Sequence, residues 1–126
     1  MSEKPVAQKL LIKENYRVLL INEPTGYRSL LGALPLKTKV TVEPQGPVDF
    51  IQIFLTSKKE LDQLFPLKSL LAEKGLLWVT YPKVTSKVKT DVNRDKIAAW
   101  AKTVGLQAVA MVSIDDIWLA LRRKII

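Results

Sequence analysis

The chain has 126 residues and contains no cysteine and no histidine, which excludes disulfides, thiolate nucleophiles, Cys/His zinc sites and imidazole acid–base catalysis. With 48% apolar residues, we expect a single domain over residues 1–126 with one sizeable core. The net charge of +8 favours an anionic partner, although lysines spread from Lys4 to Lys124 equally suit a solubilising surface.

Two segments bear on location. The residues Met1–Pro5 are polar and no apolar stretch follows them, so no secretory signal is expected. The longest apolar stretch, Leu106–Leu121, is interrupted by Asp115 and Asp116, which argues against a membrane span. We therefore expect a cytoplasmic protein without membrane attachment.

The first part of the chain predicts two helices and two strands. Helical spacing of apolar residues predicts a short helix over Val6–Ile12. Arg17–Asn22 reads as a strand apolar on both faces, the pattern of a parallel sheet covered by helices on both sides. A short helix is predicted at Arg28–Ala33, and Lys39–Glu43 suits an edge strand, where lysine discourages pairing with other chains.

The middle of the chain reads strand, helix, strand. Val48–Leu55 and Gly75–Tyr81 are apolar runs, and Ser57–Lys74 between them carries helical spacing. A capping box opens this helix, and the glycine that follows it is predicted to cap its C-terminus. Because parallel strands cannot be joined by a tight turn, the segment is predicted to be a βαβ crossover.

The last part predicts a helix and a hairpin. The helix is expected to begin at an Asp91 or Asn93 cap and to end at Gly105. Leu106–Ile114 and Ile117–Arg123 are separated by a tight turn and should pair antiparallel. The fold class is therefore α/β: a three-layer, Rossmann-like, mostly parallel six-stranded sheet of order 2-1-3-4-6-5 with a C-terminal antiparallel hairpin.

Several runs of residues resemble known families. The passage from Leu70 to Val79 and the closing hairpin resemble a class I S-adenosylmethionine-dependent methyltransferase core with one strand and helix removed after the second strand. Gly75–Lys83, Thr90 with Asp91, and Asp115–Trp118 are similar to a family of small bacterial proteins known only as a domain of unknown function. The resemblance implies a truncated methyltransferase-like fold and supplies no activity.

The loops at the carboxyl ends of the strands form the predicted ligand site, because open α/β sheets bind ligands at that edge. Cations and hydroxyl groups that converge there, beside a capped helix N-terminus, suit an anion. The candidate anion-binding residues are Arg28, Lys58, Lys83, Ser86 and Lys87. The competing explanation is that loops are polar in any case.

The loop after the first strand argues against a cofactor. A cofactor loop in this fold needs several glycines so that the backbone approaches the ligand, whereas Asn22–Tyr27 holds one glycine and Pro24. We therefore expect no cofactor, and S-adenosylmethionine only under an alternative in which Glu43 accepts hydrogen bonds from ribose hydroxyls rather than being a solvated edge residue. The cofactor-binding candidates of that alternative are Thr25, Gly26, Tyr27, Glu43, Thr56 and Ser57.

The sequence predicts no catalytic residue and no metal site. The leading interpretation is a non-catalytic methyltransferase-like domain that binds a protein partner or an anionic ligand at the carboxyl edge of its sheet. The alternatives are a reduced S-adenosylmethionine- or nucleotide-binding methyltransferase and a basic nucleic-acid-binding module. Nucleic acid is not favoured, because the basic stretch Lys83–Lys102 lacks the interleaved aromatic residues that would stack bases.

Overall fold

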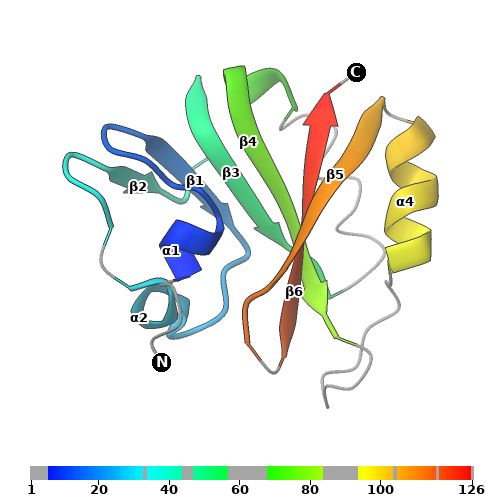
Figure 1. Ribbon diagram of the computed structural model, residues 1–126, viewed down its shortest axis with the longest axis horizontal. Coiled ribbons are helices and arrows are strands. Elements are labelled where there is room, and N and C mark those ends of the chain that lie inside the picture. Colours follow the sequence, from blue (N-terminus) through cyan, green and yellow to red (C-terminus); the bar gives the residue numbers. More distant parts are fainter. Residues whose placement is uncertain are drawn as a thin grey trace.

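A six-stranded sheet organises the protein. The computed structural model describes residues 6–32, 34–43, 47–56, 68–83, 94–103, 105–115 and 117–125. The strands lie in the order β2-β1-β3-β4-β6-β5 (Figure 1), which confirms the predicted order. β2, β1, β3 and β4 pair in parallel, and β6 runs antiparallel to both β4 and β5. The strand bounds are β1 Arg17–Ile21, β2 Lys39–Thr41, β3 Val48–Phe54, β4 Leu71–Pro82, β5 Leu106–Ser113 and β6 Trp118–Ile125.

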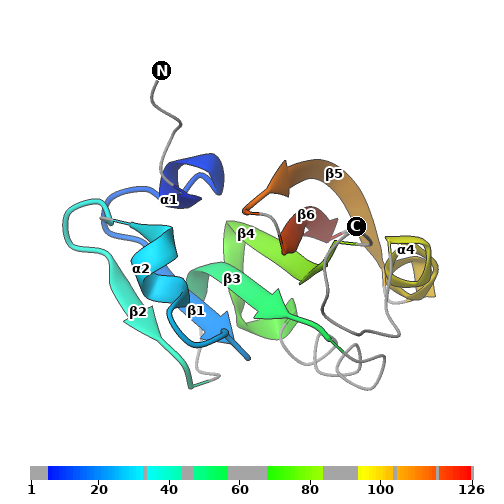
Figure 2. The ribbon, with the colours of Figure 1, turned by 90° about the horizontal axis from the view of Figure 1, so that it is seen from below.

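Helices cover both faces of the sheet, as predicted. α1 (Val6–Lys9) and α2 (Tyr27–Leu31) lie on the same side of β1 and β2 (Figure 2) and pack into one buried cluster. α4 (Arg94–Thr103) packs into a second cluster on the opposite face. The described part of the protein is therefore a three-layer α/β arrangement.

Residue alternation along the strands builds these two clusters. Val18 and Leu20 of β1 belong to the α1/α2 cluster, whereas Leu19 between them belongs to the α4 cluster. Phe50 and Ile51 of β3 divide in the same way. Because successive side chains of a strand point to opposite faces, a continuous apolar run is what a strand covered on both faces needs.

Trp78 ties the first helix to a central strand. Its side chain is buried, and its indole N–H donates a hydrogen bond of 3.1 Å to the carbonyl oxygen of Leu10. The ring packs in the cluster beneath α1 and α2. The predicted helix over Val6–Ile12 is shorter than expected, since Leu11 takes the left-handed conformation at φ 68° and ends the turn.

The start of β4 corrects one prediction. The helix expected over Ser57–Lys74 does not reach its predicted end, because Leu71–Lys74 belong to β4 after a short 3₁₀ helix, η2 (Lys68–Leu70). Residues 57–67 lie outside the described residues. Leu71 pairs with Val48, and a register shift follows before the regular pairing of Leu76 with Phe50. The apolar spacing that suggested a continuing helix belongs to an irregular strand.

Gly75 lies inside this irregular strand and caps no helix there. A Cβ on Gly75 would come within 2.7 Å of Leu71 Cδ1 and 2.9 Å of the Ala72 carbonyl oxygen. The glycine therefore permits a close approach of the chain to itself where β4 shifts register.

The C-terminal hairpin agrees with the prediction. Gly105 follows α4 with φ 77°, the left-handed conformation expected of a glycine after a helix. In the turn between β5 and β6, the Asp115 carboxylate accepts hydrogen bonds of 2.8 Å from the backbone N–H groups of Ile117 and Trp118. Asp115 thereby stabilises the turn as an aspartate typically does.

Among the helices of the described residues, none is both long and apolar enough to cross a membrane.

Candidate functional site

The turn between β1 and α2 lies at the carboxyl edge of the sheet. Asn22, directly after β1, has φ 60°, and Gly26, directly before α2, has φ 83°. The Tyr27 N–H donates to the Pro24 carbonyl oxygen at 3.1 Å and closes the turn. Thr25 and Gly26 are exposed, so the backbone of this turn faces outward at the edge where ligands bind in such sheets.

Gly26 leaves room beside its backbone. Apart from its chain neighbours, no atom of the described protein lies within 4 Å of the position that a Cβ would take. A side chain there would be strained, because the left-handed conformation disfavours residues with a Cβ. The turn therefore combines a glycine requirement with open space, the two conditions for close approach of a ligand to the backbone.

Tyr27 points into the protein. Its side chain is 2% exposed, and its hydroxyl donates a 2.6 Å hydrogen bond to Gln52 Oε1 of β3. Burial raises the pKa of the Tyr27 hydroxyl well above its ordinary value, so the phenol stays protonated at neutral pH. Tyr27 is one of the predicted cofactor-binding residues, but only its backbone lies at the carboxyl edge of the sheet, because its side chain is buried.

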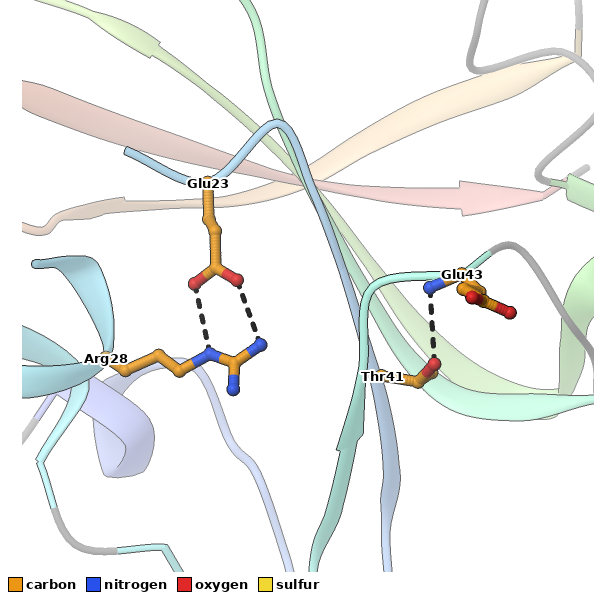
Figure 3. A network of polar contacts seen from close by, with 4 residues as sticks. All are labelled: Glu23, Arg28, Thr41 and Glu43. Atoms are coloured by element: carbon orange, nitrogen blue, oxygen red, sulfur yellow. Dashed lines mark hydrogen bonds and ion pairs between the residues drawn. The ribbon is translucent and has the colours of Figure 1, made fainter. Parts of the chain in front are cut away.

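Arg28 is engaged within the same turn. Its Nε donates to Glu23 Oε2 at 3.3 Å and its Nη2 to Glu23 Oε1 at 3.0 Å, which makes a bidentate pair (Figure 3). The Arg28 side chain is 56% exposed, so the pair is screened by water. The predicted anion-binding guanidinium already has a carboxylate partner.

Glu43 follows β2 on the exposed surface. Its backbone N–H donates to Thr41 Oγ1 at 3.2 Å, and its carboxylate points away from the Glu23–Arg28 pair (Figure 3). The end of β2 lies beside the end of β1, because Thr41 pairs with Leu19. Glu43, the residue predicted to accept hydrogen bonds from ribose, therefore lies just after the strand that neighbours β1.

The other predicted residues divide into described and undescribed ones. Thr56 is exposed just after β3. Lys83 follows β4, and its Nζ donates a 2.6 Å hydrogen bond to Ser113 Oγ of β5. Ser57, Lys58, Ser86 and Lys87 lie outside the described residues. The described set thus comprises the β1–α2 turn, Glu43, Thr56 and Lys83.

Sequence reasoning missed a polar row beneath this edge. Gln52 and Thr80 are fully buried, and Gln52 Nε2 donates to Thr80 Oγ1 at 2.9 Å. Tyr27, Gln52 and Thr80 therefore form one hydrogen-bonded row across β3 and β4. The signal for it was a glutamine within the apolar run of residues 50–54, since a buried amide requires partners.

Within the described residues, no three Asp or Glu side chains gather as metal ligands.

Comparison with known proteins places the fold. No protein-family model matches the chain, and no curated protein matches it significantly in sequence. A solved S-adenosylmethionine-dependent methyltransferase from Aquifex aeolicus is similar in structure with a TM-score of 0.69 at 15% identity, covering 96% of this chain and 88% of that chain. The ribosomal protein L11 methylase of Lactobacillus delbrueckii subsp. bulgaricus gives a TM-score of 0.59 at 14% identity, over 94% of this chain and 74% of that chain. The structure of DhpI with SAH gives 0.59 at 13% identity, over 94% of this chain and 82% of that chain.

The protein therefore has the Rossmann-like fold of the S-adenosylmethionine-dependent methyltransferases in a truncated form, with six strands among the described residues. At these identities the likeness establishes the fold alone.

Proposed function

We propose that the protein is a non-catalytic methyltransferase-like domain that binds an adenosine-containing ligand at the carboxyl ends of β1 and β2. S-Adenosylmethionine and S-adenosylhomocysteine are the ligands to test first. Topology supports the carboxyl edge at β1, because the strand order reverses beside β1, which pairs with β2 on one side and β3 on the other, and ligands of open sheets bind near such a reversal. The DhpI neighbour is a complex with SAH in the same fold.

The conformation of Gly26 carries the proposal. The sequence suggested that a loop with one glycine and Pro24 would be too bulky for such a ligand. The open space beside Gly26, together with its φ of 83°, supports close approach at the one position where a glycine is retained. Glu43 at the neighbouring strand end supports the ribose side of the same ligand.

A simple anion is the less favoured ligand. The described cations of the predicted anion site, Arg28 and Lys83, donate to Glu23 and Ser113 respectively. An anion would compete with these contacts. Close approach of an adenosine-containing ligand to the backbone of Gly26 requires neither of these cations.

The non-catalytic part of the proposal rests on protonation and pairing. The chain contains no histidine and no cysteine. The phenol nearest the turn, that of Tyr27, is buried, protonated and bound to Gln52, so it does not serve as a base. The guanidinium of Arg28 is held by Glu23. The carboxylate of the turn, that of Glu23, is engaged in the same pair, so the described part of the turn supports binding rather than proton transfer.

Calorimetric titration with S-adenosylhomocysteine, S-adenosylmethionine and inorganic phosphate tests the binding. We expect dissociation constants of about micromolar order for the two adenosyl compounds and no measurable heat with phosphate. Gly26→Val should weaken binding about ten-fold or more, while Lys102→Ala, on the exposed surface of α4, should not. Absence of heat from both adenosyl compounds with the wild-type protein would overturn the proposal, and heat from phosphate alone would replace it with a simple anion site.

Transfer of a labelled methyl group tests the absence of catalysis. The protein and methyl-labelled S-adenosylmethionine are incubated with a cell extract that is afterwards separated into RNA, protein and small molecules. We expect the same labelling with the wild-type protein and with Gly26→Val. Labelling of any fraction by the wild-type protein above that background would contradict the non-catalytic assignment while leaving the binding site in place.

A further inference from the structure

We infer that Tyr27 is a positioning residue: its buried phenol holds the exposed Thr25–Gly26 turn in the conformation that receives the ligand. This inference rests on the proposed function for the nature of the ligand. The Tyr27 side chain does not reach the carboxyl edge of the sheet. The inference therefore gives the buried row of Tyr27, Gln52 and Thr80 a role in ligand binding.

The turn needs an anchor because α2 does not stabilise it alone. α2 has five residues, and a helix of that length is not stable without tertiary contacts. Gly26 at its N-cap provides no side-chain hydrogen bond to the first turn. Besides the Tyr27 N–H bond to Pro24 and the exposed Glu23–Arg28 pair, the start of α2 is therefore fixed by the residues that the helix buries, of which Tyr27 is the first.

The phenol supplies a directional anchor. Its hydrogen bond to Gln52 is 2.6 Å long, and Gln52 is held in turn by its 2.9 Å hydrogen bond to Thr80. All three side chains are buried: Tyr27 belongs to α2, Gln52 to β3 and Thr80 to β4. A hydrogen bond in such surroundings fixes one position of the ring, because breaking it leaves a buried polar group without a partner.

Aromatic contacts fix the orientation of the same ring. Tyr27 meets Phe54 edge to face, with ring centroids 4.6 Å apart and an interplanar angle of 71°. Phe54 meets Trp118 at 5.2 Å and 89°. The ring adjoining Gly26 is thus set against Phe54 at the end of β3, and Phe54 is in turn set against Trp118 at the start of β6.

The consequence for binding is preorganisation. The backbone of Gly26 is joined directly to the residue whose side chain is fixed at its hydroxyl and at its ring. A turn held in this way does not need to be ordered when the ligand arrives, and a smaller ordering cost means tighter binding. Without the Tyr27 hydroxyl, the Thr25–Gly26 turn would sample other conformations, and its affinity for the ligand would fall because the turn would have to be ordered on binding.

Amide hydrogen exchange and ligand affinity, measured together on Tyr27→Phe, test the inference. We expect the Tyr27 amide, which donates to Pro24, to exchange about ten-fold faster than the general loss of stability explains, with the amides of β3 as the internal reference. The affinity for S-adenosylhomocysteine should fall about ten-fold. Tyr16→Phe is the matched control, since it removes the same atom from a partly buried tyrosine at the opposite end of β1.

The outcomes separate the inference from the proposed function. If the wild-type protein binds neither S-adenosylhomocysteine nor S-adenosylmethionine, the proposed function is wrong, and the exchange of the Tyr27 amide still decides whether the phenol holds the turn. If the wild-type protein binds and Tyr27→Phe binds equally well, the positioning role is wrong. Equal acceleration of the turn and β3 amides would also overturn it, because the hydroxyl would then contribute to stability only.

Discussion

The carbonyl oxygen of Leu10 accepts a 3.1 Å hydrogen bond from the indole of Trp78, a residue 68 positions further along the chain. The bond joins the end of the N-terminal helix to the strand that lies between β3 and β6. It also gives the buried carbonyl at the end of α1 a partner, in a turn where Leu11 has already left the helical conformation.

Trp78→Phe should therefore lower the free energy of unfolding by about 2–3 kcal/mol, through a lost hydrogen bond and a small cavity. Urea unfolding followed by circular dichroism measures the change. Trp118→Phe is the control, because the Trp118 ring packs in the same cluster but contacts Phe54 rather than a carbonyl oxygen. Equal losses from the two variants would show that the bond to Leu10 contributes nothing.

Gly75→Ala should destabilise the protein more than Gly26→Ala. A methyl group on Gly75 would lie 2.7 Å from Leu71 Cδ1 and 2.9 Å from the Ala72 carbonyl oxygen. A methyl group on Gly26 would meet open space, so its cost comes only from the left-handed backbone conformation. We expect losses of about 2–3 kcal/mol and about 1 kcal/mol, respectively. The same urea titration gives both values.

Leu71→Ala provides a further check on the Gly75 prediction. Combined with Gly75→Ala, it removes the side-chain part of the clash and leaves the contact with the Ala72 carbonyl oxygen. The two substitutions together should cost less than the sum of their separate costs. Strict additivity would contradict a direct contact between residues 71 and 75.

A double-mutant cycle measures the polar row. Tyr27→Phe alone leaves the buried Gln52 carbonyl oxygen without its donor and should cost about 1–3 kcal/mol. Adding Gln52→Leu removes the stranded group, so the second substitution should cost less in the Tyr27→Phe background than in the wild type. An interaction free energy indistinguishable from zero would mean that the two side chains do not depend on each other.

The stability of the protein should fall at alkaline pH because of Tyr27. Burial raises its pKa in the folded state above the value of about 10 for an unfolded tyrosine. The folded state therefore binds this proton more tightly, so the contribution is fully present below about pH 10 and is lost as the pH rises further, by up to about 1.4 kcal/mol per pH unit.

The comparison of wild type with Tyr27→Phe isolates this group. Urea unfolding from about pH 8 to about pH 11 should show the wild-type advantage over the variant shrinking above about pH 10. The other titrating groups are common to both proteins. A constant difference across this range would contradict the raised pKa.

The strand order and the crossovers were predictable because they depend on the pattern of apolar residues and on the lengths of the connections, not on individual side-chain contacts. An apolar run such as that of β3 has to be covered on both faces, and the two aspartates after β5 leave room only for a hairpin. The glycine after α4 was likewise predictable, since a helix end commonly requires a left-handed residue there.

The start of β4 and the polar contacts were not predictable in the same way. Leu71 has helical spacing with its neighbours, but its pairing with Val48 depends on a register shift that no local pattern encodes. The pairing of Glu23 with Arg28 and of Tyr27 with Gln52 depends on how a turn is oriented over the sheet. Topology therefore predicted which residues lie at the carboxyl edge of the sheet. Whether a side chain there can contact a ligand depends on its partners within the folded protein, such as Glu23 for Arg28 and Gln52 for Tyr27.

The position of β2 at the margin of the sheet explains how a shortened member of this architecture stays intact. β2 has three residues, and its Val40 is only partly buried against the α1/α2 cluster. Further strands or helices inserted after β2 would extend the sheet outward from that margin, away from the side chains that fill both clusters. Shortening the fold at this edge therefore removes exposed elements and leaves both buried clusters intact.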